Sequence, residues 1–237
     1  GVFMSAFKGG IYIPLLLLLF MIPKRNFGEK VKYPVVVASA ILLAVVTFAA
    51  VNSNIFKDVS SSTSGSENEL MWTESEGFTL RRMFTHPKEA LCMLFNTFFL
   101  MGGTHYAEMF ASGFGWLQIY TSGFLTAGFT VLMVLTLLNC EGREICFNKK
   151  QRIISLSAAA VSIFIIVISM WIFWTPAGSS HIVGLQGRYF IPLLFCAVYP
   201  LKNSRCIIKK DIGGGIIFAA VMFHALTFWE IYIRMAV

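Results

Sequence analysis

Charged side chains are scarce in this chain of 237 residues. Asp, Glu, Lys and Arg together make up 13% of it, whereas 57% of the residues are hydrophobic and Phe alone occurs 23 times. A soluble domain carries about 25% charged residues, so this chain could not cover its own surface with polar groups in water. Long apolar faces need no polar cover in lipid, and the composition therefore predicts an integral membrane protein.

Patterns that carry familiar chemistry are also missing. The sequence shows no Ser, His and Asp arranged in the order of a hydrolase catalytic triad, no nucleotide-binding glycine loop and no CxxC pair. Cys140 and Cys146 are separated by five residues, a spacing that matches no metal site. We therefore interpret all the cysteines as structural, and we predict neither a metal ion nor another cofactor. The cysteines are Cys92, Cys140, Cys146, Cys196 and Cys206.

The excess of basic over acidic residues, a net charge of +7, could suggest a nucleic-acid partner. The basic residues, however, lie in short loops between apolar runs, which is the positive-inside pattern of membrane proteins. They are not interleaved with aromatic residues on one polar face. We therefore predict that the chain contacts membrane lipid and binds no nucleic acid.

The apolar runs set the predicted helices, because a bilayer core of about 30 Å needs roughly 20 apolar residues per crossing. Four runs have that length and three are shorter, one of which holds Pro192 and Pro200. The glycines at 213–215 read as a hinge before the last run. The long runs are 33–51, 119–138, 153–174 and 216–236, and the short ones are 9–22, 88–101 and 189–201.

Loop charges predict which side each loop faces. The loop after the first run and loops 139–152 and 202–212 carry the Lys and Arg residues and should be cytoplasmic. The long, Ser-rich and acidic loop 52–87, and loop 175–187 without Lys or Arg, should be extracytoplasmic. This arrangement holds only if the run 88–101 does not cross, so that 102–118 is also extracytoplasmic.

The predicted fold is therefore all-α: a polytopic transmembrane helix bundle with about six crossings and one re-entrant or interfacial helix. We expect residues 1–237 to form a single transmembrane domain, with 52–87 as a long extracytoplasmic loop and 88–118 as a non-crossing outer-face segment. The chain begins Gly-Val-Phe-Met with no signal peptide before its first apolar run, so we expect it to be part of a longer protein.

The strongest local feature is G-L-Q-G-R-Y-F-I-P at 184–192. Two glycines allow close backbone approach, and Arg188 beside Gln186 stands where the chain enters the membrane. An arginine there can fork two hydrogen bonds onto a phosphate or carboxylate. The alternative is an arginine that only snorkels to lipid headgroups, and both interpretations remain open.

Glu230 lies inside the last apolar run, and an intramembrane carboxylate is a functional candidate by default. Its expected partner is Arg188, at the same depth. The alternative, which we favour, is a structural ion pair or an interfacial Glu beside Trp229 and Tyr232. We interpret His224, deeper on the same helix, as a packed core histidine.

His105 and Glu108 are three residues apart and could share a helical face. One His and one Glu are too few ligands for a metal site. Trp116, further along the same segment, is most simply an interfacial anchor, with a stacking platform for a sugar ring as the secondary interpretation.

The motif at 184–193 resembles the G-x-Q-G-R-Y-x-x-P signature of a widespread bacterial family of polytopic membrane proteins. That family, long of unknown function, is grouped with the GT-C-type, polyprenyl-phosphate-sugar-dependent glycosyltransferases. Weaker landmarks of the family are matched in order at 8–12, 22–24, 86–87 and 115–117. The resemblance covers most of the chain and corresponds to the family's C-terminal half, with Gln118 where the family often has an acidic residue.

The resemblance implies a protein of the bacterial cytoplasmic (inner) membrane that transfers a sugar from a polyprenyl-phosphate donor to a saccharide acceptor in cell-envelope polysaccharide or glycolipid assembly. It implies that Arg188, helped by Gln186, Gly187 and Tyr189, meets the lipid phosphate, with Glu230, Trp116, His105 and Glu108 as supporting residues. The catalytic acid of such enzymes belongs to a first outer loop, so no residue here receives that role. The alternatives are a flippase for a lipid-linked saccharide and a non-catalytic membrane scaffold.

Overall fold

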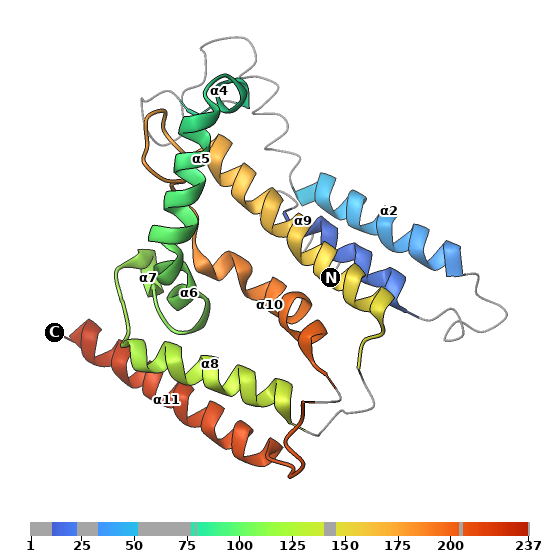
Figure 1. The fold of residues 1–237 in the computed structure, drawn as a ribbon, viewed down its shortest axis with the longest axis vertical. Coiled ribbons are helices and arrows are strands. Elements are labelled where there is room, and N and C mark those ends of the chain that lie inside the picture. Colours follow the sequence, from blue (N-terminus) through green and yellow to red (C-terminus); the bar gives the residue numbers. More distant parts are fainter. Residues whose placement is uncertain are drawn as a thin grey trace. The chain divides into compact units, whose positions relative to one another are not determined.

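The computed structural model describes residues 11–22, 33–51, 77–78, 80–139, 146–203 and 206–236. Within these ranges the chain is helical, and its only extended pairings are isolated bridges rather than strands (Figure 1). The prediction of an all-α protein is therefore confirmed. The chain divides into two compact units, Gly1–Thr97 with Lys150–Leu185 and Phe98–Lys149 with Gln186–Val237.

The first unit is dominated by α9 (Lys149–Trp174), whose 26 residues are long and apolar enough to cross a membrane. Trp171 and Ile166 are both buried on this helix. The Phe78 ring packs against Trp171 with 5.3 Å between the ring centroids. The apolar run expected at 153–174 is thus a helix of spanning length, and its N-terminal turn carries the basic residues that precede the run.

Two further helices of the first unit come from the N-terminal part of the chain. The run expected at 9–22 forms η2 (Ile13–Met21), a 3₁₀-helix, and the next run forms α2 (Tyr33–Val51) as expected. The Tyr33 hydroxyl donates to the Leu19 carbonyl at 3.3 Å. Loop 23–32 and residues 52–76 lie outside the described residues, so the charges predicted to orient them are not placed.

The short run at 88–101 is interrupted rather than one continuous helix. It follows α4 (Leu80–Thr85) and consists of α5 (Pro87–Phe95) and the π-helical turn η4 (Asn96–Leu100). Pro87 occupies the first turn, where its missing N–H costs nothing. Gly102 and Gly103 open the next helix, α6 (Gly102–Phe110).

The loop after α9 is held against the end of the α5–η4 segment within the first unit. The Asn96 amide donates to the Ser180 carbonyl at 2.8 Å, and the Ile182 N–H donates to the buried Thr97 hydroxyl at 2.9 Å. These bonds satisfy backbone groups of a loop that has no secondary structure of its own. The residues of loop 175–187 that belong to this unit therefore lie beside the segment that was expected on the same side of the membrane.

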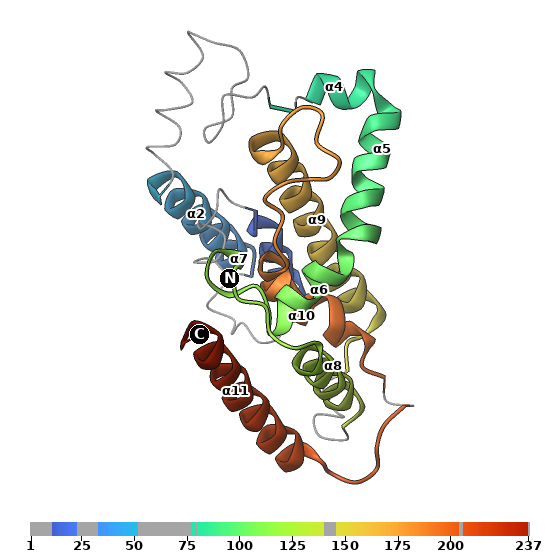
Figure 2. The ribbon, with the colours of Figure 1, turned by 90° about the vertical axis from the view of Figure 1, so that its left-hand side faces the viewer.

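The second unit contains α6 (Gly102–Phe110), α7 (Phe114–Leu117), α8 (Gly123–Leu138), η5 (Gly187–Phe190), α10 (Ile191–Val198), η6 (Tyr199–Leu201) and α11 (Gly213–Ala236). Helices α8 and α11 lie side by side, and α6 packs against both α8 and η5 (Figures 1 and 2). The last three-part run, η5–α10–η6, is the short helix expected at 189–201, with a proline near the start of α10 and another in η6.

Two helix starts differ from those expected, for identifiable reasons. Helix α8 begins after Ser122 rather than at Ile119, because the Phe114 N–H donates to the Ile119 carbonyl at 3.0 Å and keeps that residue extended. The glycines at 213–215 are no hinge but the first turn of α11. The Asp211 carboxylate accepts from the Gly213 N–H at 2.9 Å, so a donor of that turn is already satisfied.

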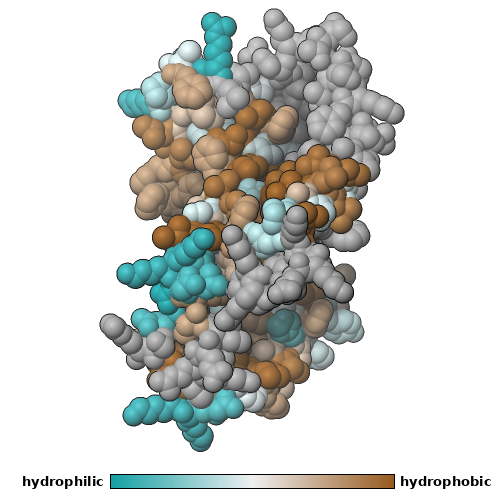
Figure 3. All heavy atoms as spheres, turned by 90° about the vertical axis from the view of Figure 1, so that its right-hand side faces the viewer, coloured by the Kyte–Doolittle hydropathy of each residue, from teal (hydrophilic) through white to brown (hydrophobic). Residues whose placement is uncertain are grey.

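Many large apolar side chains of the described helices are exposed. Only 6% of the spanning stretch of α11 is buried, and Phe218, Phe228 and Trp229 on that helix are each more than 60% exposed. Figure 3 shows apolar side chains over much of the face that it presents. Apolar exposure of this extent is untenable in water and is the expected condition of a lipid-facing helix.

Candidate functional site

The structure joins two predicted features, the 184–192 motif and the His105/Glu108 pair, where η5 packs on α6. Gly187 is buried at this contact. A Cβ atom at this position would overlap the His105 carbonyl oxygen and come within 2.8 Å of the Glu108 Cβ. The second glycine of the motif is therefore required for close backbone approach, as predicted from the sequence.

Glu108 is the residue that fixes this contact. Its side chain is 5% exposed, and its Oε2 accepts a hydrogen bond of 2.6 Å from the Gly187 N–H. Gly113, with φ at +71°, folds the following turn so closely over Glu108 that a Cβ there would lie 2.9 Å from the Glu108 Cγ. A short bond from an N–H to a buried carboxylate is among the stronger hydrogen bonds in proteins.

His105 lies beside this carboxylate, as expected from the three-residue spacing. Its Nδ1 is 3.5 Å from the Glu108 Oε2, and the ring is 12% exposed. Both ring nitrogens are buried, and neither forms a hydrogen bond with the described residues. No group of three potential metal ligands occurs in the part of the chain that the structure describes.

Arg188 projects from the turn that Glu108 holds. Its side chain is exposed, and its Nε donates to the Gln186 Oε1 at 2.6 Å. The Tyr189 side chain is hydrogen-bonded to Arg188, while its backbone N–H donates to the Gln186 carbonyl at 3.1 Å and closes the turn. Gln186 and Tyr189 thus orient the guanidinium, and Glu108 holds the turn that carries it.

Glu230 belongs to a separate cluster in the second unit, and the predicted pairing with Arg188 is wrong. Its carboxylate accepts from the Ser122 N–H at 2.8 Å and from the Ser122 hydroxyl at 3.0 Å. Arg234, one turn further along α11, donates to the same carboxylate at 2.9 Å. The four-residue spacing puts Arg234 on the same helix face, so Glu230 is paired locally. The structural alternative fits this residue.

A second polar cluster closes the other end of the α8–α11 pair. The Asn139 amide donates to the Asp211 carboxylate at 3.3 Å, and its carbonyl oxygen accepts from the Ile212 N–H at 3.2 Å. The two helices are therefore antiparallel, with polar side chains joining them at both ends. Roughly 26 Å of helix separates Gly213, which is bonded to Asp211, from Glu230 at 1.5 Å per residue, close to the thickness of a bilayer core of about 30 Å.

The position of α6 follows from its bonds to α8. Tyr106 and Thr130 share a hydrogen bond of 2.8 Å, and the Thr121 hydroxyl donates to the Ala111 carbonyl. Thr130 lies roughly 12 Å along α8 from its Ser122 end. Helix α6 therefore runs beside the half of α8 that is nearer the Glu230 cluster.

Two other predicted residues have different outcomes. His224 is exposed rather than packed in a core. Its ring meets the Phe129 ring edge-on at 4.9 Å, and its Nδ1 is bonded to the Ala220 carbonyl at 2.7 Å, so the backbone satisfies it. Trp116 lies in α7, but its side chain is outside the described residues.

Sequence reasoning missed Ser122, Gly113 and Arg234. The four-residue spacing from Glu230 could have identified Arg234 as its partner. No local signal links Ser122 to a residue 108 positions later. Gly113 adopts a positive φ that lets the turn fold over Glu108. Nothing in the sequence distinguishes it from an ordinary loop glycine.

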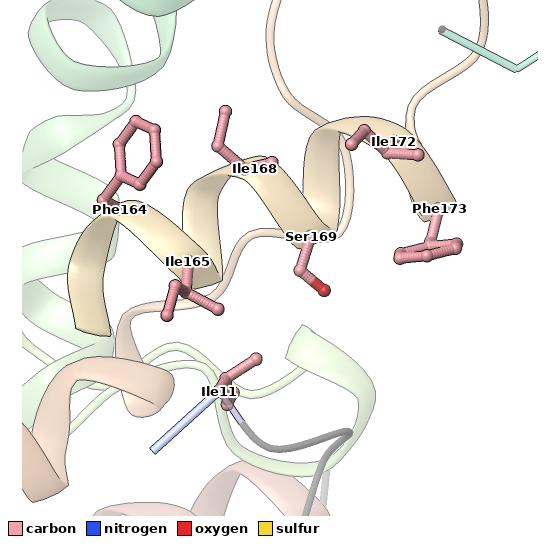
Figure 4. Close-up of a pocket in the computed structure, with 7 residues that line it drawn as sticks. All are labelled: Ile11, Phe164, Ile165, Ile168, Ser169, Ile172 and Phe173. Atoms are coloured by element: carbon pink, nitrogen blue, oxygen red, sulfur yellow. The ribbon is translucent and has the colours of Figure 1, made fainter. Parts of the chain in front are cut away.

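An apolar groove lies in the first unit beside α9. Its volume is about 270 Å³, and Ser169 is its one polar lining side chain (Figure 4). Binding sites combine apolar walls with a few convergent polar groups, which this groove lacks. The lining residues are Ile11, Phe164, Ile165, Ile168, Ser169, Ile172 and Phe173.

These observations define an all-helical membrane protein. Two helices are long enough to span a bilayer, many apolar side chains are exposed, and the α8–α11 pair has polar clusters at both ends. Comparison with protein families is consistent with this class. Residues 1–197 match the family described as "Predicted membrane protein (DUF2142)", and the chain belongs to that family. No curated protein and no solved structure matches the chain.

Proposed function

We propose that this protein acts as a membrane glycosyltransferase that takes sugar from a polyprenyl-phosphate donor, and that Arg188 binds the lipid phosphate. The observation that carries the proposal is the anchored turn. An exposed guanidinium is oriented by Gln186 on a backbone that the buried Glu108 holds through Gly187. An arginine fork held in this way suits the geometry of a phosphate group.

The expected depth of the turn supports a lipid-borne ligand. Arg188 is the second residue of the short apolar helix Gly187–Leu201. Helix α6, which contacts this turn, lies beside the half of α8 nearer its Ser122 end. If the polar clusters of the α8–α11 pair mark the two membrane interfaces, the turn lies in the half of the bilayer nearer the Ser122 end. A polyprenyl phosphate brings its charge to the interface that bounds this half, while its tail remains in the hydrocarbon.

The proposed reaction is a displacement at the anomeric carbon of the donor sugar. A carboxylate removes the proton of an acceptor hydroxyl, whose oxygen then bonds to that carbon. The bond from the carbon to the phosphate oxygen breaks with inversion, and polyprenyl phosphate leaves. Arg188 would stabilise the negative charge that develops on the leaving phosphate. None of the described carboxylates is assigned as the base.

The proposal can be tested with the purified protein in lipid nanodiscs and a panel of polyprenyl-phosphate sugars. Arg188→Ala should lower the transfer rate at least about tenfold, as expected when a charged contact to phosphate is lost. Arg188→Lys should retain part of the rate, because it keeps the charge without the planar fork. Arg81→Ala, which removes another exposed arginine on α4, is the matched control.

Three outcomes are informative. Loss of transfer in the Arg188 variants, with the Arg81 variant unchanged and all proteins equally folded, supports the proposal. Equal transfer by Arg188→Ala and the unsubstituted protein overturns the assigned role. Movement of intact lipid-linked saccharide across the bilayer without transfer would favour the flippase alternative and reject the enzyme.

A further inference from the structure

We propose that Glu108 is a positioning residue that acts through the Gly187 N–H to hold Arg188 in its binding geometry. The expected effect of Glu108 on lipid binding rests on the proposed function. Its structural part, the effect of Glu108 on the geometry of the turn, does not. Glu108 was expected only as a supporting side chain of the site. The structure gives it a specific partner, 79 positions away in the sequence.

Glu108 is not placed to act on a substrate directly. Its side chain is 5% exposed, and its Oε2 is 2.6 Å from the Gly187 nitrogen. A carboxylate buried to this extent presents almost no surface to a substrate. Its surroundings contain His105 on the same helix and Arg188 and Tyr189 on η5, while α8 contributes no titratable side chain.

The Gly187 backbone links Glu108 to Arg188. Gly187 is the residue directly before Arg188, and its N–H is the only main-chain donor that the Glu108 carboxylate binds among the described residues. Because the Gly187 backbone is also pressed against the His105 carbonyl, a small displacement of the turn is resisted on two sides. The direction of the Arg188 side chain is set by this backbone and by Gln186.

Substitutions at position 108 can separate a role of Glu108 as hydrogen-bond acceptor from a role of its charge. If Glu108 acts by accepting the Gly187 N–H bond, Gln at 108 should substitute, because its amide oxygen has the same reach. Asp keeps the charge but is one methylene shorter, so it should fail to reach. A carboxylate needed for its charge or for proton transfer would give the opposite order, with Asp tolerated and Gln inactive.

The experiment uses the full chain in nanodiscs with fluorotyrosine incorporated at Tyr189, so that fluorine NMR reports the environment of the turn. Glu108→Gln should keep the resonance of the unsubstituted protein, whereas Glu108→Asp and Glu108→Ala should shift or broaden it. Glu89→Ala is the matched control, because it removes a helical Glu whose partner is Arg82. Thermal unfolding identifies any variant that fails to fold.

Binding of polyprenyl phosphate is measured on the same samples. Glu108→Ala and Glu108→Asp should weaken it about tenfold, and Glu108→Gln should weaken it about threefold at most. An unchanged fluorine resonance in folded Glu108→Ala overturns the positioning role. A shifted resonance without loss of lipid binding supports the structural part and overturns the effect of that geometry on binding, while Arg188→Ala tests the role of Arg188 itself. The two proposals therefore fail separately.

Discussion

Glu230 provides the most quantitative test of the structure, because its contacts are few and each can be removed separately. Glu230→Ala deletes two bonds to Ser122 and the pair with Arg234. A hydrogen bond within a membrane protein averages about 0.6 kcal/mol, and bonds to charged groups reach about 1.5 kcal/mol or more. The exposed pair with Arg234 adds roughly 0.5 kcal/mol.

The expected loss of stability for Glu230→Ala is therefore about 2 kcal/mol, which raises the unfolding constant roughly 30-fold. Ser122→Ala should cost about 1 kcal/mol, because the backbone N–H bond survives. Arg234→Ala should cost roughly 0.5 kcal/mol, since that side chain is half-exposed. The order of the three variants follows from the geometry alone.

The assay is reversible unfolding in mixed detergent micelles, followed by circular dichroism, with lipid-phosphate binding measured on the folded samples. Binding should be unchanged in all three variants, since this cluster is separate from the turn that carries Arg188. The reasoning is refuted if Glu230→Ala is as stable as Arg234→Ala. It is also refuted if Glu230→Ala abolishes binding while leaving stability intact, which would restore the functional interpretation of this residue.

Three further predictions concern other parts of the second unit. Gly187→Ala should destabilise the protein by about 1–3 kcal/mol, because the added methyl overlaps a backbone carbonyl; thermal unfolding measures it, and a neutral effect would contradict the α6–η5 contact. Asn139→Ala should lower the free energy of unfolding by about 1 kcal/mol, because the bonds to Asp211 and Ile212 are lost. A loss as large as that of Glu230→Ala would contradict the expectation that the Glu230 cluster stabilises the α8–α11 pair more than the Asn139 cluster does. A cysteine at Gln118 should react with an impermeant maleimide in intact cells, while Cys206 reacts only after permeabilisation; the reverse pattern would refute the non-crossing segment 88–118.

Sequence pattern was sufficient for the helices that depend on apolar length. The runs that became α9 and α11 are long and nearly free of charge, so composition decides them without help from packing. Pro87 lies in the first turn of α5, where its missing N–H is harmless. The Gln186–Arg188 bond joins residues two positions apart, within reach of local reasoning.

The remaining features depend on tertiary contacts that a single sequence does not display. Nothing local to Glu108 indicates that its acceptor oxygen meets a backbone N–H 79 residues later. Helix α8 begins later than the apolar pattern predicts, because Phe114 and Ile119 pair across a short turn and Ile119 is therefore not helical. Glu230 was assigned to the wrong arginine because depth alone was considered, although Arg234 stands one helical turn away.

The central claim is that Arg188, on a turn anchored by Glu108, binds the phosphate of a polyprenyl lipid. The direct measurement is phosphorus NMR of polyprenyl phosphate in nanodiscs containing the unsubstituted protein, Arg188→Ala or Arg81→Ala. We predict a shifted phosphorus resonance with the unsubstituted protein and with Arg81→Ala, and its return to the position in empty nanodiscs with Arg188→Ala. An equal shift with all three proteins would contradict the claim.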